Sequence, residues 1–436
     1  MSLPLRNKLV GLAALVSFAL VIALTGDDRS PADSTAPSPA STLPTTTLPT
    51  TTLPTISLPS APTTTTTDPR ILTMTAQVDE LVADATPKEL AYRLVVTGLD
   101  GAELGAQLED TVGSVCVGGV FLTESRDNWV PEDDPAAFRA AVDDLDERVW
   151  GTRCTFRPLI TTDAELGEVI RVPADSPAAA PSWAVRYIEG EPYNVLLDLQ
   201  EQSFTYATAL RELGIDVNFG AVADVDTAPD HFMARRGRSF GGDPGIVASL
   251  SSAVVQGHCA AGLAATLKHF PNQGATFEDP HAERSTAVGG VDHWETTGRL
   301  PYETTSAPLV MTGHIFMDID PDLPASMSAT VTTGLLRDEL GYDGVVITDD
   351  LSTMRGAIDV IAEPGERAVA AIRAGADLVL FVVDDDIAPV VEALSTEMET
   401  DPAFELRARD SVRRALMLRL ALTDPGLFPL CGSPNS

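Results

Sequence analysis

Eight short apolar runs, each followed by polar residues and then by a stretch with helical character, constrain this chain most. The runs are rich in Val, Ile and Leu and do not alternate with polar residues, which is typical of strands buried on both faces of a parallel sheet. They span residues 93–96, 119–122, 158–161, 217–223, 264–269, 309–312, 344–348 and 376–383. Helices are expected over residues 133–149, 199–213, 245–260, 331–340 and 364–374, with a closing helix over 404–422.

Glycines mark the ends of three expected helices. Gly214, Gly341 and Gly375 each follow a helical stretch at the position where a left-handed C-cap glycine belongs. Eight strand–helix units predict an α/β fold of the (β/α)8 TIM-barrel type over residues 69–430, followed by a tail over 431–436. An open doubly wound sheet is the alternative, although no GxGxxG motif follows the first run.

The N-terminus differs in composition from the rest of the chain. Arg6 and Lys8 precede an apolar run over residues 9–24, which is the pattern of a secretory signal and is short for a spanning helix of about 20 residues. We expect residues 1–26 to be a cleaved signal peptide or an uncleaved membrane anchor. Residues 27–68 are rich in Thr, Pro and Ser, repeat TTTLP twice and predict a disordered linker. Together they indicate an exported protein that is extracellular, in the cell wall or tethered to a membrane.

The net charge excludes several kinds of partner. The 436 residues include 63 acidic and 29 basic side chains, for a formal charge of −34. Nucleic acids and anionic lipid surfaces would be repelled, whereas a neutral sugar or another small molecule would not. The apolar fraction of 44% is enough for a folded core. Nothing in the sequence indicates the oligomeric state.

Four cysteines are present, at positions 116, 154, 259 and 431. In an exported protein Cys116, Cys154, Cys259 and Cys431 can form two disulfides with three possible connectivities, and buried free thiols are the alternative. No CxxC spacing exists, so a zinc site built on thiolates is not expected. The histidines include no HxxxH motif either, and the sequence implies neither a metal nor a cofactor.

Titratable residues follow five consecutive strands of the expected barrel. Active sites of such barrels lie at the C-terminal ends of the strands. Each of these residues alone could be a helix cap or a solvated loop residue, but together on one rim they predict a functional site. They are Asp163, Asp224, Lys268, His269, His314, Asp349 and Asp350.

Lys268 is unusual because the chain otherwise avoids lysine. Only three of the 29 basic residues are lysines, and the other two are Lys8 and Lys88. A compact ammonium on a flexible stem can reach a sugar hydroxyl where a planar guanidinium would not fit. The position of Lys268 at the end of an apolar run therefore favours a binding role, although chance remains the simpler explanation for one residue.

Several ordered motifs resemble the β-N-acetylhexosaminidase branch of glycoside hydrolase family 3. KHFPNQG at residues 268–274 followed by DPH at 279–281 is similar to the KHFPGHG…DSH of that branch, and GVVITDDL at 344–351 to its GVIFSDDL. The other matches, in chain order, are TDAELG at 162–167 with VDQEGG, RSFG at 238–241 with RSFG, MTGH at 311–314 with MTAH, and PAS at 324–326 with PAS. The resemblance extends over most of residues 91–428.

The resemblance implies a barrel enzyme that cleaves glycosides with retention through a covalent glycosyl-enzyme. The family nucleophile falls on Asp349, and its neighbour Asp350 is expected to cap the helix that begins at Leu351. The general acid/base falls on His281, oriented by Asp279. An imidazole titrates near neutral pH, and a carboxylate on one ring nitrogen fixes the tautomer that the other nitrogen uses for proton transfer.

Sugar contacts carry over from the same motifs. The residues that match those lining the family's sugar subsite are Asp163, Arg238, Lys268, His269 and His314. Charged, hydrogen-bonding side chains suit vicinal hydroxyl groups, and the loss of one would leave its partners unpaired. The expected substrate is an oligosaccharide or a muropeptide.

The sequence also departs from the family pattern. Asn272 and Gln273 replace the Gly and His of KHFPGHG, in the loop by the N-acetyl side of the sugar, and Pro280 stiffens the loop of the dyad. We therefore predict an active exo-glycosidase with shifted specificity, acting on terminal β-linked N-acetylglucosamine from the cell wall or chitin. The alternatives are a decayed enzyme that only binds sugar or peptidoglycan, and a β-glucosidase or phosphorylase variant of the same family.

Overall fold

The computed structural model describes residues 68–98, 116–122, 134–150, 154–167, 169–383, 387–424 and 430–431. These residues belong to one compact unit, Ala61–Ser436. The expected leader and the linker up to residue 67 lie outside the described residues, as does the tail from residue 432. No helix within the described ranges has the length and apolar character needed to cross a membrane.

Eight parallel strands close into a barrel, as the sequence predicts. Their order around the barrel is β1, β11, β10, β7, β5, β4, β3 and β2, and β2 pairs again with β1. The strands are β1 (Val95–Gly98), β2 (Gly119–Leu122), β3 (Leu159–Thr162), β4 (Val217–Val222), β5 (Ala264–Phe270), β7 (Leu309–Thr312), β10 (Val345–Asp350) and β11 (Leu378–Phe381). Each overlaps an expected strand, and the boundaries differ by at most two residues, which is the usual uncertainty of an element end.

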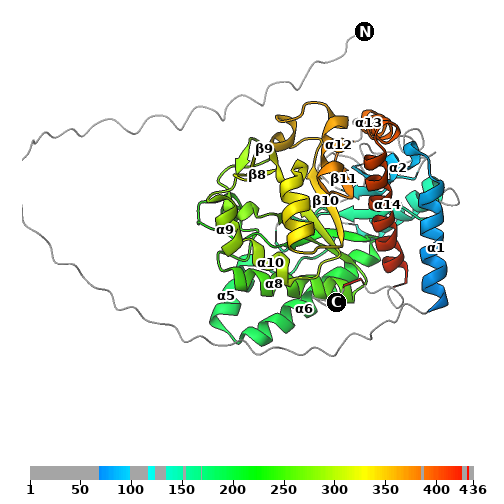
Figure 1. The fold of residues 1–436 in the computed structure, drawn as a ribbon. Coiled ribbons are helices and arrows are strands. Elements are labelled where there is room, and N and C mark those ends of the chain that lie inside the picture. Colours follow the sequence, from blue (N-terminus) through cyan, green and yellow to red (C-terminus); the bar gives the residue numbers. More distant parts are fainter. Residues whose placement is uncertain are drawn as a thin grey trace, which may run out of the picture. The chain divides into compact units, whose positions relative to one another are not determined.

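Helices follow the strands and pack around them (Figure 1). They are α1 (Pro69–Asp84), α2 (Pro87–Arg93), α4 (Pro135–Leu145), α5 (Ala180–Glu189), α6 (Pro192–Glu212), α7 (Phe232–Arg236), α8 (Pro244–Ala260), α9 (Gly290–Thr296), α10 (Arg299–Thr304), α11 (Arg355–Ile358), α12 (Pro364–Ala374), α13 (Ile387–Thr400) and α14 (Pro402–Thr423). The described residues also contain two π-helical segments, η1 (Asp146–Trp150) and η4 (Thr330–Glu339), and two 3-10 segments, η2 (Gln273–Ala275) and η3 (Ala325–Met327). The expected helix over residues 331–340 is thus π-helical.

An Asp-Pro pair begins four of the helices. Proline at the first helical position has a suitable φ angle and needs no N–H partner. The aspartate before it accepts hydrogen bonds from the backbone of the first turn and caps the helix. The four capping residues are Asp68, Asp134, Asp243 and Asp401.

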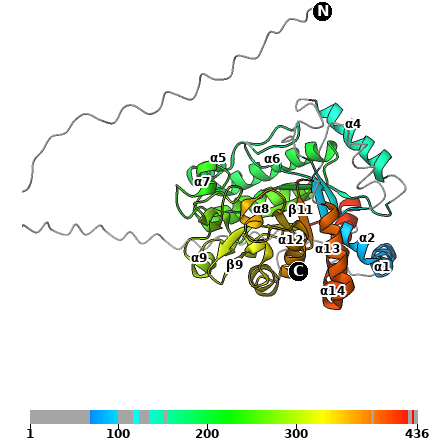
Figure 2. The same ribbon diagram turned by 90° about the horizontal axis from the view of Figure 1, so that it is seen from above.

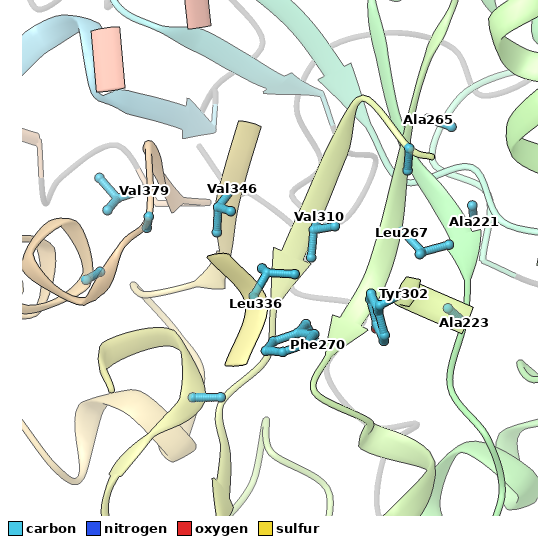
Figure 3. Packing of buried hydrophobic residues seen from close by; sticks show 14 of the residues in the cluster. Ala221, Ala223, Ala265, Leu267, Phe270, Tyr302, Val310, Leu336, Val346 and Val379 are labelled. Carbon is cyan, nitrogen blue, oxygen red and sulfur yellow. The ribbon is translucent and has the colours of Figure 1, made fainter. Parts of the chain in front are cut away.

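Alternate residues of the strands pack on opposite faces of the barrel wall. In β10, Val345 and Ile347 belong to a cluster made mostly of strand residues, which fills the barrel interior, and Val346 belongs to the layer beneath the helices. Figure 3 shows this outer layer, where strand residues such as Val310 and Val346 lie with the helical Leu336. Burial on both faces explains why the strands are continuous apolar runs.

Helices near the two ends of the described chain contact each other, and two disulfides add further links. Helix α1 lies beside α14 in both views (Figures 1 and 2), and Arg413 of α14 donates to Asp79 of α1 at 2.7 Å. All four cysteines pair: Cys116 bonds to Cys154, and Cys259 at the end of α8 bonds to Cys431. The structure therefore selects one of the three connectivities.

Two buried carboxylates stand at the N-terminal end of the barrel. Asp216 precedes β4 and Asp377 precedes β11, and both are fully buried. Each faces three arginines and accepts a backbone N–H from the neighbouring strand. The arginines are Arg157, Arg211 and Arg419 at Asp216, and Arg337, Arg407 and Arg414 at Asp377. These clusters lie opposite the rim where the sequence predicts chemistry.

Candidate active site

The parallel barrel gathers the predicted site residues at one rim. Asp163 directly follows β3, Lys268 and His269 lie near the end of β5, and Asp349 lies near the end of β10. His314 comes two residues after β7. Because all the strands run in the same direction, their C-terminal ends meet at the same end of the barrel.

A charged network joins three of these residues to one that the sequence did not single out. Lys268 Nζ lies 2.7 Å from Asp163 Oδ1 and 2.7 Å from Glu165 Oε1. Arg238 donates to both oxygens of Glu165, from Nε at 2.9 Å and from Nη2 at 2.6 Å. Asp163 and Arg238 remain partly open to solvent, whereas Lys268 and Glu165 are buried.

The two cations keep Glu165 ionised. Burial alone would raise the pKa of the Glu165 carboxyl, but Arg238 and Lys268 lower it by more, so the net shift is strongly downward. Burial alone would lower the pKa of Lys268, but Asp163 and Glu165 raise it above its ordinary value. Glu165 and Lys268 therefore both carry charge at neutral pH, and the formal charges of the two acidic and two basic side chains cancel.

His269 is held by a second carboxylate. Its Nδ1 donates to Asp224 Oδ2 at 2.8 Å, and its backbone N–H lies 3.3 Å from Asp224 Oδ1. Asp224 is fully buried and also accepts the backbone N–H of Gln273 at 2.6 Å. The ring is thereby fixed with Nε2 as its remaining polar atom. Asp224 follows β4 and thus belongs to the rim that the sequence predicts.

The electrostatic surroundings of Asp349 favour its ionised form. Burial alone would raise the pKa of this carboxyl. Interactions with His269, His314 and His281 and a hydrogen bond from the backbone N–H of Asp350 lower it by more, so the pKa lies below its usual range. His281 belongs to the loop after β5, yet it lies within electrostatic reach of Asp349. A carboxylate that stays ionised is what a nucleophile at this position requires.

Asp350 has a structural role, as expected. Its carboxylate accepts the backbone N–H groups of Ser352 at 2.8 Å and Thr353 at 2.9 Å, and that of Val382 at 3.0 Å. The segment that it caps is a turn rather than the expected helix, because α11 begins only at Arg355. Asp350 thus fixes the chain directly after Asp349 to the end of β11.

His314 is hydrogen-bonded to the same segment. Its Nδ1 lies 2.7 Å from Ser326 Oγ, and its Nε2 lies 2.9 Å from the carbonyl oxygen of Asp350. Burial lowers the pKa of His314, although Asp349 and Asp350 oppose the shift. Both ring nitrogens have protein partners, which differs from the direct sugar contact that the resemblance implies for His314.

The predicted dyad is formed at the solvent-facing side of the rim. His281 Nδ1 lies 2.7 Å from Asp279 Oδ1, and the His281 side chain is 57% exposed. The backbone N–H of Gly356 donates to the carbonyl of Pro280 at 3.0 Å, which attaches this loop to α11. Arg236 of α7 lies 3.7 Å from Asp279 Oδ2. With Nδ1 held by Asp279, Nε2 is the ring nitrogen that can exchange protons with a ligand.

A small sheet joins the loop that carries the dyad to the loop that follows β7. It consists of β6 (Ser285–Thr286), β8 (Ile315–Met317) and β9 (Asp320–Pro324), in the order β6, β8, β9. The loop after β5 that carries the dyad pairs through β6 with β8, which directly follows His314. The loops after β5 and β7 are thus tied to each other beside the rim.

The two residues that depart from the family motif, Asn272 and Gln273, are buried, and Asn272 is hydrogen-bonded to the segment that follows β4. Asn272 accepts the backbone N–H of Val225 at 2.8 Å and donates to the carbonyl of Val225 at 3.1 Å. The Gln273 carboxamide nitrogen lies 3.7 Å from the sulfur of Met233, and its oxygen has no hydrogen-bond partner among the described residues. Asn272 therefore fixes the loop, whereas Gln273 leaves a buried acceptor near α7.

Glu165 is the member of the network that sequence reasoning missed. It lies two residues after Asp163 in the segment that resembles VDQEGG, so a signal was present. Its partners are Arg238 and Lys268, far away along the chain, and only the folded barrel shows the pairing. In the described part of the chain, no group of three or more His, Cys, Asp and Glu residues could hold a metal ion.

Comparisons with known proteins identify the family of this chain. The sequence model of one family, the glycosyl hydrolase family 3 N terminal domain, matches residues 88–418. A beta-hexosaminidase of Bordetella avium is 32% identical over 330 residues, which cover 74% of this chain and 87% of the relative. A beta-hexosaminidase of Stenotrophomonas maltophilia is 30% identical over 293 residues, covering 66% of this chain and 82% of the relative.

Solved structures show the same barrel. A glycoside hydrolase family 3 beta-N-acetylglucosaminidase from Paenibacillus superposes with a TM-score of 0.68 at 30% identity, over 78% of this chain and 63% of that one. This chain therefore spans less than two thirds of the Paenibacillus protein. A beta-N-acetylhexosaminidase from Beutenbergia cavernae superposes with a TM-score of 0.65 at 28% identity, over 77% of this chain and 99% of that one.

A closed parallel barrel with carboxylates, histidines, an arginine and a buried lysine at its C-terminal rim defines, together with these relatives, a glycoside hydrolase. The chain belongs to glycosyl hydrolase family 3.

Proposed function

We propose that the protein is a retaining exo-glycosidase that removes terminal β-linked N-acetylglucosamine, or a closely related sugar, from oligosaccharides. The names of its relatives, beta-hexosaminidase and beta-N-acetylglucosaminidase, support this substrate class. The observation that carries the proposal is the placement of a partly buried, ionised Asp349 at the rim, with His281 on an exposed loop within electrostatic reach of it. One group suits nucleophilic attack and the other suits proton transfer to the leaving group.

In the first step Asp349 attacks the anomeric carbon and forms a glycosyl ester. His281, doubly protonated and held at Nδ1 by Asp279, donates its Nε2 proton to the departing glycosidic oxygen. In the second step the neutral imidazole accepts a proton from water, which attacks the anomeric carbon and releases Asp349. Two inversions at the same carbon give net retention.

The sugar is bound by the groups around this pair. We assign Asp163, Arg238, Lys268 and His269 to the hydroxyl groups of the sugar, because each carries polar atoms at the rim. His314 acts as a positioning residue, since it holds the backbone carbonyl of the residue that follows Asp349. Gln273, whose side-chain oxygen has no hydrogen-bond partner among the described residues, is the residue that we expect to alter the preference for the 2-substituent.

The test is hydrolysis of p-nitrophenyl N-acetyl-β-D-glucosaminide. Wild-type protein should release nitrophenol with retention at the anomeric carbon, and Asp349→Ala should lose nearly all turnover. Asp343→Ala is the matched control, because this aspartate is exposed and precedes β10 at the opposite end of the barrel. An inactive wild type, or an Asp349→Ala variant that is as active as wild type, would refute the proposal. Product analysis with and without inorganic phosphate distinguishes hydrolysis from phosphorolysis.

We further propose that the enzyme is exported and acts on glycans of the cell wall or of chitin, such as muropeptides. The signal-like residues 1–26 and the linker over 27–68 support export. One relative, from Arthroderma benhamiae, is named an uncharacterized secreted glycosyl hydrolase and is 32% identical over 228 residues. Fractionation of cells that express the full chain should find it outside the cytosol; a cytosolic protein with an intact N-terminus would contradict export.

A further inference from the structure

Four charged side chains form two layers at the rim between β3 and β5. Glu165 and Lys268 are almost completely buried, with 1% and 2% of the side chain exposed. Arg238 and Asp163 lie above them, with 16% and 25% exposed. Two anions and two cations give the cluster no net charge. The outer pair is the more exposed of the two.

Both carboxylate oxygens of Glu165 contact the two cations. Its Oε1 lies 2.6 Å from Arg238 Nη2 and 2.7 Å from Lys268 Nζ, and its Oε2 lies 2.9 Å from Arg238 Nε. Asp163 contacts Lys268 through Oδ1 at 2.7 Å. Lys268 therefore has two anionic partners, one buried and one partly open.

From this geometry we propose that Glu165 is a positioning residue for the glycosidase reaction. It fixes the guanidinium of Arg238 and the ammonium of Lys268, and its charge leaves Asp163 available to the sugar. The proposal rests on the assignment of Arg238, Lys268 and Asp163 to the sugar subsite.

The effect of Glu165→Gln follows from the charges. The amide has nearly the same shape but no charge, so the cluster gains a net positive charge beneath a partly open surface. Asp163 then becomes the only anion that contacts Lys268 in the cluster and is drawn toward it, away from the sugar. An opposite charge within about 4–6 Å shifts a pKa by about 1–3 units, and its removal lets burial lower the pKa of Lys268.

A purely structural ion pair would behave differently. If Glu165 only stabilised the fold, Glu165→Gln would lower the melting temperature and leave the sugar affinity of the remaining folded protein unchanged. A positioning role instead requires that substrate binding and the ionisation of Lys268 change together.

The scarcity of lysine provides a direct measurement. The chain has only three lysines, Lys8, Lys88 and Lys268, so protein labelled with 13C-lysine gives a spectrum in which Lys268 can be assigned with single Lys→Arg variants. In Glu165→Gln the titration midpoint of Lys268 should fall by about 1–3 pH units. Lys88 is exposed on α2 and serves as the internal reference. An unchanged Lys268 midpoint would overturn the proposal.

Kinetics provide the second measurement. Because charged hydrogen bonds to the sugar are weakened, KM of Glu165→Gln for the nitrophenyl substrate should rise by about 10- to 100-fold with a smaller change in kcat. The alkaline limb of kcat/KM should move to lower pH, since Lys268 then loses its proton at lower pH. Glu189→Gln, at an exposed glutamate of α5, is the matched control and should keep wild-type kinetics. A wild-type KM and alkaline limb in Glu165→Gln would contradict the positioning role.

Glu165→Asp keeps the proposal testable if the glutamine variant does not fold. This variant retains the charge but shortens the side chain, so the midpoint of Lys268 should stay within about one unit of wild type while KM rises. A midpoint that falls as far as in a charge-removing variant would overturn the proposal. The spectrum needs no substrate, so an inactive wild type would refute the proposed function without deciding the role of Glu165.

Discussion

Asp216→Asn tests how the N-terminal end of the barrel is stabilised. Asp216 is fully buried, and its carboxylate faces Arg157 Nη2 at 2.9 Å, Arg211 Nη1 at 2.8 Å and Arg419 Nη1 at 2.6 Å. It also accepts the backbone N–H of Ile160 at 3.0 Å. Asparagine is close to isosteric, so the substitution removes the charge and leaves three guanidinium groups facing each other.

The expected loss in free energy of unfolding follows from the burial of Asp216 and its three arginines. Removing one partner of a buried ion pair costs about 3–5 kcal/mol. The three arginine side chains are 14–31% exposed, so water compensates part of the loss and we expect about 3 kcal/mol. At an unfolding entropy of about 2 cal/mol/K per residue, this lowers the melting temperature of a barrel of this size by about 4 °C.

The loss of stability in Asp216→Asn should be larger at neutral pH than at acidic pH. Burial alone would raise the pKa of Asp216, but Arg419, Arg157, the N–H of Ile160 and Arg211 hold it below its usual range. The ionised carboxylate therefore contributes stability that is complete above the unfolded pKa of about 3.9 and is lost as the pH falls through the lower folded pKa. The difference between wild type and Asp216→Asn should be largest near pH 7 and shrink below about pH 4.

Thermal melts at a series of pH values, together with kcat/KM at 25 °C, test this reasoning. Asp343→Asn is the control, because this aspartate is exposed near the same end of the barrel. Asp216→Asn should melt lower than the control and keep wild-type kcat/KM, since Asp216 precedes β4 and the candidate site lies at the other end of the strands. Equal melting temperatures, or a difference that grows on acidification, would refute the account of this cluster.

Two further predictions concern the dyad and the second disulfide. His281→Ala should slow cleavage of a disaccharide by about 10²–10⁴-fold and that of a nitrophenyl glycoside much less, because nitrophenolate leaves without a proton; equal losses on both substrates would contradict the acid role. Removing the Cys259–Cys431 bridge by a double Cys→Ser substitution should lower the free energy of unfolding by up to about 5 kcal/mol, because the bridge closes a loop of 172 residues. Denaturant unfolding measures this change, and unchanged stability would contradict it.

The barrel was predictable from local sequence. Its strands are buried on both faces, so each appears as a continuous apolar run rather than an alternating one. Three helix ends were also readable, because Gly214, Gly341 and Gly375 adopt positive φ angles of 92°, 68° and 124°. Helix α13 was not predicted. Its sequence is largely apolar, and the length and periodicity of such a stretch do not distinguish it from the apolar strand that precedes it.

The charge pairing at the site was only partly predictable. The resemblance indicated which positions carry chemistry, and the structure brings Lys268, Asp163 and Arg238 into one network around Glu165. The partners of Glu165 lie far away in sequence, and no local sequence pattern indicates which carboxylate forms an ion pair with which cation. The same holds for Asp216, whose partner Arg419 comes from the last helix. Long-range ion pairs depend on the closure of the barrel, which sequence periodicity does not encode.

Trapping the glycosyl-enzyme tests the central claim most directly. A 5-fluoro glycosyl fluoride of N-acetylglucosamine accumulates the covalent intermediate. The ring fluorine slows both steps because it destabilises the positive charge of their transition states, whereas the good leaving group, fluoride, keeps formation of the intermediate faster than its hydrolysis. The intact protein should gain the mass of one sugar, and the modified peptide should carry the label on Asp349. A label on another residue, or rapid turnover with inversion and no adduct, would contradict the assignment of Asp349 as the nucleophile of a retaining glycosidase.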